Sequence, residues 1–515
     1  MKRIIVGENE WKTSDNLFFE NQDEVLEYID KSDDDLVIVD ARVENNVHWN
    51  LVELLRHDIV HAGLLFANKS YFENLNYCVT SWFFLDSPNH QPCVSWKATA
   101  HFMYIKKNLP KQLGGLDRQY ESIQTALADL TYRALKAGGS IEFNPTLFKN
   151  VTTLPLDRVQ SSLQDQLRFI GKYIGRNALF YAKFFSFYNN PFRWSTWKCV
   201  FTRNESLAEH RNGCEYDFNL VFTEKRKHIE SYTAIIPTIN RYDYVGKSID
   251  SLLNNEIPPS EIIVVDQTPL NQRNAEAYKK YSNDSRVKIF FLDSAGQSSS
   301  RNFAIENASN EWLLLFEDDA EAWKDMITRH IYLLEHSDAD VSTGVSLAPW
   351  KDISYIPENN RKFFLADVFA TGNAFARRSD ILKVGGLDLA FNRGSGADDD
   401  IGKRLYLNGK RVVFNFQAIE THHKAPSGGM RVHGSWWNNK TTVLGEFPPA
   451  TKVYSIQKFY PSKFRFPLYL QYFLTAKRRH SWMEFLILWV LAPFKLVKSL
   501  KKARLLVEIS NIPRQ

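Results

Sequence analysis

A five-residue apolar run that leads directly into three carboxylates constrains the fold of this chain more than any other stretch. Trp312 to Phe316 is followed at once by Glu317, Asp318 and Asp319. A short apolar run of this kind predicts a buried strand of a parallel sheet. In an open α/β sheet, ligands bind outside the carboxyl ends of the strands. We therefore expect the three carboxylates at a binding crevice.

Adjacent carboxylates repel one another unless a cation or a set of hydrogen-bond donors relieves the repulsion. Oxygen ligands suit Mg²⁺ and Mn²⁺, which commonly bridge protein carboxylates and substrate phosphates. A plainer interpretation is a solvated acidic turn that caps a helix beginning near Ala322. Taken alone, this stretch leaves the metal site and the acidic turn both open.

The pattern around this run alternates between strands and helices, which predicts βαβ units and a mainly parallel, Rossmann-like sheet flanked by helices. Polar residues follow three successive strands, at Thr238, at Asp266 and at the carboxylates, so one sheet edge could hold a nucleotide. We expect strands at 232–236, 261–265, 287–292, 312–316 and 412–416, and helices at 244–254, 271–281, 301–308 and 401–407.

The composition is globular and close to the average for folded chains. At 515 residues, the length suggests two to four domains, and a net charge of +5 does not by itself indicate a nucleic-acid partner. The cysteines are far apart and favour reduced thiols over a zinc site or a disulfide framework. We expect no signal peptide and no transmembrane helix. The four cysteines are Cys78, Cys93, Cys199 and Cys214.

Further motifs follow the first strands in a fixed order. A Gly-Ser loop at 293–299 leads to Arg301-Asn302, and Gly394 to Asp400 opens a helix. Acidic residues in a first helical turn offset the helix dipole, which accounts for Asp400 without any further role. With these motifs, residues 230 to 435 resemble the inverting, nucleotide-sugar-dependent glycosyltransferases of the GT-A fold, in the large family-two class.

The resemblance implies roles for individual residues. Asp398 would be the catalytic base, and Asp319 with His422 would hold a Mn²⁺ or Mg²⁺ ion. The donor-binding residues would be Pro237, Thr238, Asn240, Arg241, Asp266, Arg301, Asn302, Glu317 and Asp318, and the acceptor or sugar-binding residues would be Gly372, Asn373 and Asp399.

Two residues depart from the family pattern. Glu317 replaces the usual first Asp of the metal-binding DxD motif, and its longer side chain can still reach the ribose or the metal. Ala397 replaces the usual Glu before the base, which leaves acceptor recognition open.

An internal repeat connects the two ends of the chain. Leu113-Gly114-Gly115-Leu116-Asp117 corresponds to Val384-Gly385-Gly386-Leu387-Asp388, and Asp129 with Arg133 corresponds to Asp400 with Arg404. All these pairs share one spacing of 271 residues, that between 117 and 388. The repeat predicts that residues 1–150 are a GT-A-like half domain. Leu127 occupies the position of Asp398, and Asp40 is the one carboxylate left after the run 36–39, so we expect this lobe to be non-catalytic.

The C-terminal tail is basic. From Lys458 to Gln515, the sequence has twelve Lys or Arg residues but only two acidic residues, Glu484 and Glu508. The apolar run 485–494 is too short to span a bilayer, and the basic residues after it favour a helix lying on an anionic membrane surface. A helix docked on the protein core is the alternative.

These observations predict four segments and one main activity. The segments are a degenerate lobe (1–150), a helical connector (151–230), a catalytic GT-A domain (231–450) and a basic amphipathic tail (451–515). The activity would be metal-dependent transfer from a UDP-sugar or another nucleotide sugar to a glycan or lipid-linked acceptor, in capsule or O-antigen synthesis, on the cytoplasmic face of the inner membrane. A nucleotidyltransferase and a catalytically dead sugar-binding scaffold are the alternatives.

Overall fold

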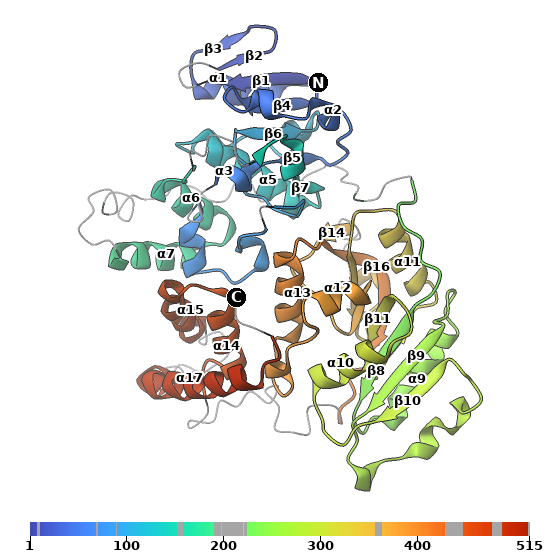
Figure 1. Ribbon diagram of the computed structural model, residues 1–515. Helices are drawn as coiled ribbons and strands as arrows, with labels where there is room; N and C mark the ends of the chain where they lie inside the picture. The colour runs from blue at the N-terminus through green and yellow to red at the C-terminus, as the bar shows by residue number, and fades with distance from the viewer. Residues whose placement is uncertain are drawn as a thin grey trace. The chain divides into compact units, whose positions relative to one another are not determined.

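The computed structural model separates the chain into two compact units (Figure 1). Unit 1 comprises Met1–Leu220 with Tyr406–Gly409, and unit 2 comprises Val221–Leu405 with Lys410–Gln515. The structure describes residues 1–7, 11–67, 71–88, 90–151, 158–189, 197, 220, 224–355, 363–427, 446–475 and 487–512.

Unit 2 is built on a nine-stranded mixed sheet with the order β10-β9-β8-β11-β15-β13-β16-β12, in which β14 also pairs with β16. The first four strands run parallel, as the sequence predicts, and antiparallel pairs follow from β15 onward. The sheet is therefore mixed rather than mainly parallel. The strands are β8 (Thr233–Thr238), β9 (Glu261–Asp266), β10 (Val287–Phe291), β11 (Trp312–Phe316), β12 (Ala320–Ala322), β13 (Val341–Leu347), β14 (Phe363–Leu365), β15 (Asn373–Arg377) and β16 (Val412–His422).

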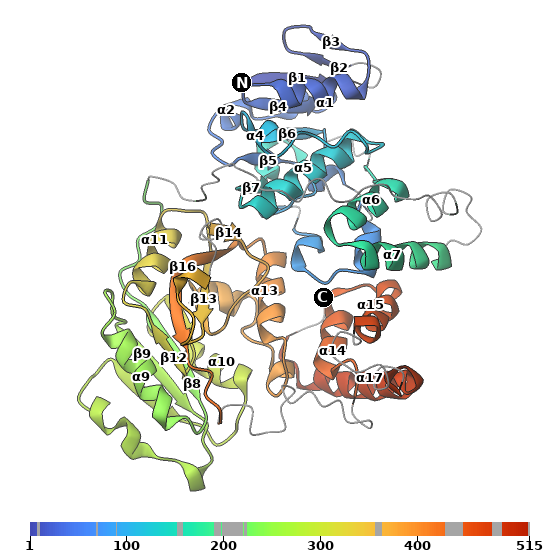
Figure 2. The ribbon, with the colours of Figure 1, turned by 180° about the vertical axis from the view of Figure 1, so that it is seen from behind.

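Helices cover the faces of this sheet (Figure 2). Helix α10 packs on β8 and β9, while α11 packs on β13 and β16. All five residues of β11 are buried, as expected for a central strand with helices on both sides. The helices of unit 2 are α9 (Tyr242–Leu253), α10 (Gln297–Asn307), α11 (Met326–Glu335), α12 (Arg378–Lys383), α13 (Ala397–Leu407), α14 (Ala450–Phe459), α15 (Ser462–Thr475) and α17 (Ala492–Ile509).

Two expectations for unit 2 are wrong. Residues 320–322 form β12, paired with the end of β16, and α11 begins only at Met326. The three carboxylates therefore connect two strands and do not cap a helix near Ala322. The expected helix 271–281 is instead two 3₁₀ segments, Leu270–Gln272 and Ala275–Tyr281, because Asn274 between them has a non-helical backbone.

Unit 1 contains a seven-stranded sheet with the order β3-β2-β1-β4-β6-β5-β7. The apolar run 60–66 has the pattern of a buried strand, but it forms a strand only as far as His61 and then turns into a helix. The elements are β1 (Lys2–Val6), β2 (Trp11–Thr13), β3 (Phe18–Phe19), α1 (Gln22–Lys31), β4 (Leu36–Asp40), α2 (Trp49–Val52), β5 (Ile59–His61), α3 (Gly63–Phe66), β6 (Phe102–Ile105), α4 (Leu109–Gln112), α5 (Ile123–Ala137), β7 (Ile141–Phe143), α6 (Leu163–Tyr173) and α7 (Arg176–Asn189).

The two sheets share a five-strand pattern. In unit 1, β1 pairs parallel with β4, β4 antiparallel with β6, β6 antiparallel with β5, and β5 parallel with β7. In unit 2, the strands β8, β11, β15, β13 and β16 repeat these pairings in the same order. Beyond β1, unit 1 has the antiparallel strands β2 and β3, where unit 2 has the parallel strands β9 and β10.

The register of these strands matches residues between the units. Val39 lies opposite Phe102 in unit 1, and Phe316 lies opposite Asn373 in unit 2. Phe102 and Asn373 are separated by the 271-residue spacing of the repeat. Asp40, which follows Val39, therefore occupies the position of Glu317, and Arg42 occupies that of Asp319.

The C-terminal helices pack on one another within unit 2. Helix α17 contacts α14 and buries Lys495, Ser499 and Ala503, which lie one turn apart on a single face. Among the described helices, none is both long and apolar enough to cross a membrane. Residues 476–486, which include the start of the apolar run in the tail, lie outside the described part of the chain.

Candidate active site

Glu317, Asp319 and His422 meet where β11 and β16 end. Glu317 follows the last residue of β11 directly, and His422 is the last residue of β16. His422 Nε2 lies 3.4 Å from Glu317 Oε2 and 3.3 Å from Asp319 Oδ1. One ligand atom from each residue lies within 4.8 Å of the other two, so among the described residues this cluster could hold a metal ion.

Arg241 neutralises the carboxylates beside this cluster. A left-handed turn at Asn240 (φ 49°) places Arg241 at the start of α9, and its Nη1 lies 2.6 Å from Asp318 Oδ1 and 3.0 Å from Asp319 Oδ1. Asn tolerates this backbone conformation better than most residues. Burial raises the pKa of Asp318 to about 6, against the opposing charge of Arg241. The two carboxylates are thus held together by one guanidinium.

The two oxygens of Asp319 have different surroundings. The side chain is almost fully buried, and Oδ2 accepts a hydrogen bond of 2.8 Å from the Ala425 amide. Oδ1 is buried but accepts no well-aligned hydrogen bond. Although burial raises its pKa, the contact with His422 and the charge of Arg241 bring the pKa of Asp319 below its usual value. An ionised, incompletely satisfied oxygen is the arrangement that a cation would complete.

The donor set fits a divalent ion. Two of the three groups are carboxylates, which suit Mg²⁺ and Mn²⁺, and the imidazole favours a transition metal. Of the two ions that the resemblance implies, Mn²⁺ therefore fits these residues better. Within the set, His422 contacts both carboxylates, Glu317 and Asp319.

Asp398 lies in the first turn of α13 and is exposed, so a substrate hydroxyl could reach it. Thr371 Oγ1 donates a hydrogen bond of 2.6 Å to Asp398 Oδ1. Protein atoms nevertheless surround much of the carboxyl group, and this desolvation raises its pKa, against the opposing effects of Thr371 and Arg301. Arg301 itself is buried, with an Nε that has no hydrogen-bond partner among the described residues.

The Thr371-Gly372 pair connects Asp398 to the metal cluster. Thr371 binds Asp398, while a Cβ atom on Gly372 would lie only 2.8 Å from Glu317 Cγ. No side chain larger than hydrogen fits there without moving Glu317. This close approach brings the candidate base and the candidate metal ligands to one end of the sheet.

One predicted donor-binding residue, Asp266, is already hydrogen-bonded within the protein. Asp266 is fully buried and accepts hydrogen bonds from Tyr242, Tyr278 and the Thr268 amide. Its carboxylate is already satisfied, so it supports the loop after β9 rather than facing an open crevice.

Two of the predicted amides are likewise occupied by the protein. Asn302 donates to and accepts from the backbone of Leu387, both at 2.8 Å. Asn373 is fully buried, and its Oδ1 lies 2.8 Å from His330 Nε2. In this structure, the Asn373 side chain has no accessible surface with which to contact a sugar.

The remaining predicted residues lie at the end of β8 and in the first turn of α13. Pro237 and Thr238 lie at the end of β8, past the residues that pair with β11, which is where a central strand tolerates proline. Asp399 Oδ2 pairs with Lys403 Nζ at 2.8 Å. Asp400 is fully buried and pairs with Arg404, in agreement with the structural role expected for it.

Sequence reasoning missed two polar residues of the site. Thr371 carries no signal in the sequence, because its contact with Asp398 spans 27 positions. Glu420 lies two residues before His422 on β16, and is fully buried with one oxygen unpartnered among the described residues. Burial raises its pKa well above the usual value, against the hydrogen bond from Ser346. The available sequence signal was its position two residues before His422, because residues two apart on a strand point to the same face.

Residues 233–383 match the sequence model of Glycosyl transferase family 2. The matched region spans β8 to α12 and includes the carboxylates, Arg241, Arg301 and Thr371. Unit 2 is therefore a mixed α/β glycosyltransferase domain with a GT-A-like fold. The chain thus contains a segment, residues 233–383, that matches glycosyltransferase family 2.

Curated relatives are named as glycosyltransferases as well. The putative teichuronic acid biosynthesis glycosyltransferase TuaG of Bacillus subtilis (strain 168) is 29% identical over 119 residues, which are 22% of this chain and 46% of TuaG. The poly(ribitol-phosphate) beta-N-acetylglucosaminyltransferase TarS of Staphylococcus aureus (strain Mu50 / ATCC 700699) is 26% identical over 114 residues, which are 21% of this chain and 20% of TarS. The chain thus spans less than half the length of these two relatives.

A crystal structure of GalNAc-T7 with UDP, GalNAc and Mn²⁺ is also similar, with a TM-score of 0.36 and 12% identity. The similarity covers 44% of this chain and 48% of that chain.

Proposed function

We propose that unit 2 transfers a sugar from a nucleoside-diphosphate sugar to a hydroxyl group of a glycan or glycolipid, with inversion and with the help of Mn²⁺ or Mg²⁺. The observation that carries this proposal is the cluster of Glu317, Asp319 and His422 beside an accessible Asp398 at one end of the sheet. The family match supports sugar transfer as the reaction. The metal, the inversion and the acceptor belong to the proposal.

The residues of unit 2 suit a single displacement. The carboxylate of Asp398 would accept the proton of the acceptor hydroxyl. As that oxygen forms a bond to the anomeric carbon, the bond from this carbon to the diphosphate breaks, and the electron pair leaves with the diphosphate. A bound divalent ion would neutralise the charge on the leaving group. Asp319, Glu317 and His422 would hold the ion, and Arg241 would keep Asp318 ionised and in place.

The names of the relatives suggest the product class. TuaG is described for teichuronic acid biosynthesis and TarS for a poly(ribitol-phosphate) acceptor. We propose a UDP-sugar as donor and a bacterial surface polysaccharide or its lipid-linked precursor as acceptor. Such an acceptor would bring the enzyme to the cytoplasmic face of the inner membrane.

The proposed segments are then a non-catalytic lobe (1–150), a helical connector (151–230), the catalytic domain (231–450) and the basic tail (451–515). Leu127, at the position of Asp398, is fully buried and has no proton-accepting group. Unit 1 also lacks, among its described residues, a cluster that could hold a metal. Both observations support a single catalytic centre in unit 2.

The test replaces Asp319, one of the three candidate metal ligands. Asp319→Asn keeps the shape of the side chain but removes its charge, so Mn²⁺ binding, measured by titration calorimetry, should be lost. Sugar transfer from a panel of UDP- and GDP-sugars should fall by about 10²-fold or more, because charge on the leaving group is no longer neutralised.

Glu321→Gln provides the matched control. Glu321 lies two residues farther along and pairs with His423 rather than with the cluster. It should bind Mn²⁺ and transfer sugar as the wild type does. Full transfer by Asp319→Asn, or by the wild type in excess chelator, would contradict the metal role. Release of pyrophosphate rather than a nucleoside diphosphate would instead indicate a nucleotidyltransferase.

A further inference from the structure

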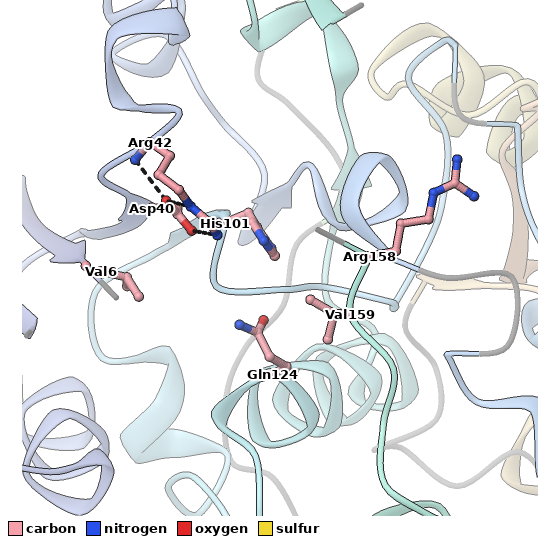
Figure 3. Close-up of a pocket in the computed structure, with 8 residues that line it drawn as sticks. Val6, Asp40, Arg42, His101, Gln124, Arg158 and Val159 are labelled. Carbon is pink, nitrogen blue, oxygen red and sulfur yellow. Dashed lines mark hydrogen bonds and ion pairs between the residues drawn. The ribbon is translucent and has the colours of Figure 1, made fainter. Parts of the chain in front are cut away.

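Unit 1 has a pocket of about 260 Å³ at the end of its own sheet (Figure 3). It is lined by Val6 at the end of β1, Asp40 at the end of β4, and residues of the loops and helix beyond them. In the register shared by the two sheets, these strand ends correspond to the ends of β8 and β11. The pocket therefore occupies the position in unit 1 that the candidate active site occupies in unit 2.

Two arginines and one aspartate are among the residues that line this pocket, and Figure 3 shows the guanidinium of Arg158 directed away from Asp40 and Arg42. Arg42 and Asp40 form a two-pronged pair, with Nε to Oδ1 at 3.0 Å and Nη2 to Oδ2 at 2.7 Å. Although burial raises it, the pKa of Asp40 is held below its usual value by Arg42, so the carboxylate stays ionised. A phosphate in the pocket would face this carboxylate, and a metal ion would face the guanidinium. Because Asp40 and Arg42 neutralise one another, neither a nucleotide diphosphate nor a cation would meet an uncompensated charge at this pair.

Neutral hydrogen-bonding groups complete the wall. Gln124 Oε1 accepts from the Ala100 amide, while its Nε2 has no partner among the described residues and can donate to a ligand. His101 stacks on Phe66, with ring centroids 4.3 Å apart, so its ring orientation is fixed. Figure 3 shows Gln124 and His101 directed toward the space between Val6 and Val159, whose apolar side chains border it.

The size of the pocket decides which ligand fits. Pockets for drug-sized molecules occupy about 300–1,000 Å³, so about 260 Å³ suits one small ring rather than a nucleotide sugar. Hydroxyl groups both donate and accept hydrogen bonds, which matches a carboxylate, a guanidinium and an amide placed side by side. Val6 and Val159 can contact the C–H groups of a ring.

We propose that this pocket is a saccharide-binding site, which holds one sugar residue of a glycan through Asp40, Arg42, Gln124 and His101. The choice of a saccharide over another neutral polyol rests on the proposed function of unit 2. Unit 1, which lacks the metal-binding residues of unit 2, would thus bind a sugar without catalysing a reaction. It would give the enzyme a second binding site for its glycan acceptor or product.

The test measures binding of simple sugars to the full chain. The probes are the methyl glycosides of glucose, galactose, mannose and N-acetylglucosamine, followed by saturation-transfer NMR, with UDP as a separate probe. At least one glycoside should bind, and Asp40→Asn and Gln124→Glu should each weaken its binding by about tenfold. Gln124→Glu keeps the acceptor for the Ala100 amide, so it preserves the local backbone while removing the donor.

Two controls separate this pocket from unit 2. Asp33→Asn alters an exposed carboxylate of unit 1 that does not line the pocket, and Asp319→Asn disables the candidate metal site. Neither should change glycoside binding, and thermal melts should show that all variants are folded. Transfer activity is not part of the readout, so a failure of the proposed function would leave the binding result interpretable.

Three results would overturn the proposal. The first is that none of the glycosides binds. The second is that glycoside binding depends on Asp319 but not on Asp40 or Gln124, which would place it in unit 2. The third is that UDP, rather than a glycoside, binds in an Asp40-dependent way.

Discussion

Two aspartates of unit 2 have surroundings that suit different tasks. Asp319 is almost fully buried between Arg241 and His422, so its charge is held in a fixed place. Asp398 is exposed at a helix start, and its pKa is raised by the protein atoms around its carboxyl group. A fixed, ionised carboxylate suits a metal ligand, and an accessible carboxyl group with a raised pKa suits a proton acceptor.

Asp398→Asn should therefore remove the proposed base while keeping the shape of the side chain and its contact with Thr371. Transfer at saturating donor should fall by about 10²–10⁴-fold, with little change in donor affinity. Asp40→Asn, which alters the corresponding lobe of unit 1, should leave the chemical step almost unchanged. If Asp40→Asn abolished transfer in a folded protein while Asp398→Asn did not, the catalytic centre would lie in unit 1 rather than in unit 2.

The pH dependence of the same reaction follows from the raised pKa of Asp398. The base acts only when ionised, so the rate should fall as the pH drops through that pKa. This acid limb should lie above the value of about 3.9 for a free aspartate. It should be absent from the residual rate of Asp398→Asn. An identical limb in the variant would assign it to another group.

At the scale of elements, each unit has its own network of charged residues that fixes a helix to a glycine turn. In unit 2, Arg404 on α13 donates to the carbonyls of Val384 and Gly386 and pairs with Asp400. Lys458 of α14 then joins Asp400 to Asp388. The glycines of the turn, at 385 and 386, have positive φ angles, which explains their place in the repeat.

Unit 1 builds the same network from the corresponding residues. Arg133 on α5 donates to Leu113 and Gly115 and pairs with Asp129, while Lys172 of α6 joins Asp129 to Asp117. The two lysines lie outside the 271-residue repeat, so the structure extends the correspondence to the helix that follows each sheet.

Removal of either arginine should therefore destabilise its own unit. Arg404→Met and Arg133→Met each leave a buried aspartate with one cation fewer, which typically costs about 3–5 kcal/mol. Hydrogen–deuterium exchange should accelerate in α13 for the first variant and in α5 for the second. Arg329→Met, which breaks an exposed pair with Asp325, should change exchange little. Equal exchange in all three variants would show that the networks are not needed.

At the scale of the whole molecule, the outer face of α17 remains apolar and basic. The helix docks through Lys495, Ser499 and Ala503, and leaves Phe494 and Val497 at least half exposed. Docking and membrane contact are thus compatible, because they use different faces of one helix. Exposed apolar and basic residues on one helix favour contact with an anionic lipid surface.

Charge reversal should weaken that contact without disturbing the docked face. Lys498→Glu with Lys501→Glu changes two exposed positions, so the protein should sediment less with liposomes that contain anionic lipid. Wild-type binding should also fall with added salt, because screening shortens the range of the attraction. Lys12→Glu, an exchange in unit 1, serves as the control. If the Lys498→Glu/Lys501→Glu variant and the wild type sedimented equally with these liposomes, this face of α17 would have no role in membrane binding.

The sequence predicted the central strand and the residues that follow it with accuracy. β11 spans the predicted run 312–316, and the repeat reappears as matching strand pairs and charge networks. The short segments were predicted less well. Residues 320–322 become a strand only because β16 pairs with them, and residues 63–66 turn helical after a strand of three residues. Local pattern carries little information about such pairings.

The sequence by itself determined the class of the fold and the acidic end of its central strand, because buried strands, glycine turns and acidic strand ends leave local marks. It also determined that one lobe repeats part of the other. Only the tertiary structure decided which polar residues face outward. Asp266 and Asn373 turn inward to satisfy buried donors and acceptors, whereas Thr371 and Arg241 meet carboxylates far along the chain. Those contacts arise from the packing of distant strands, and no local pattern encodes them.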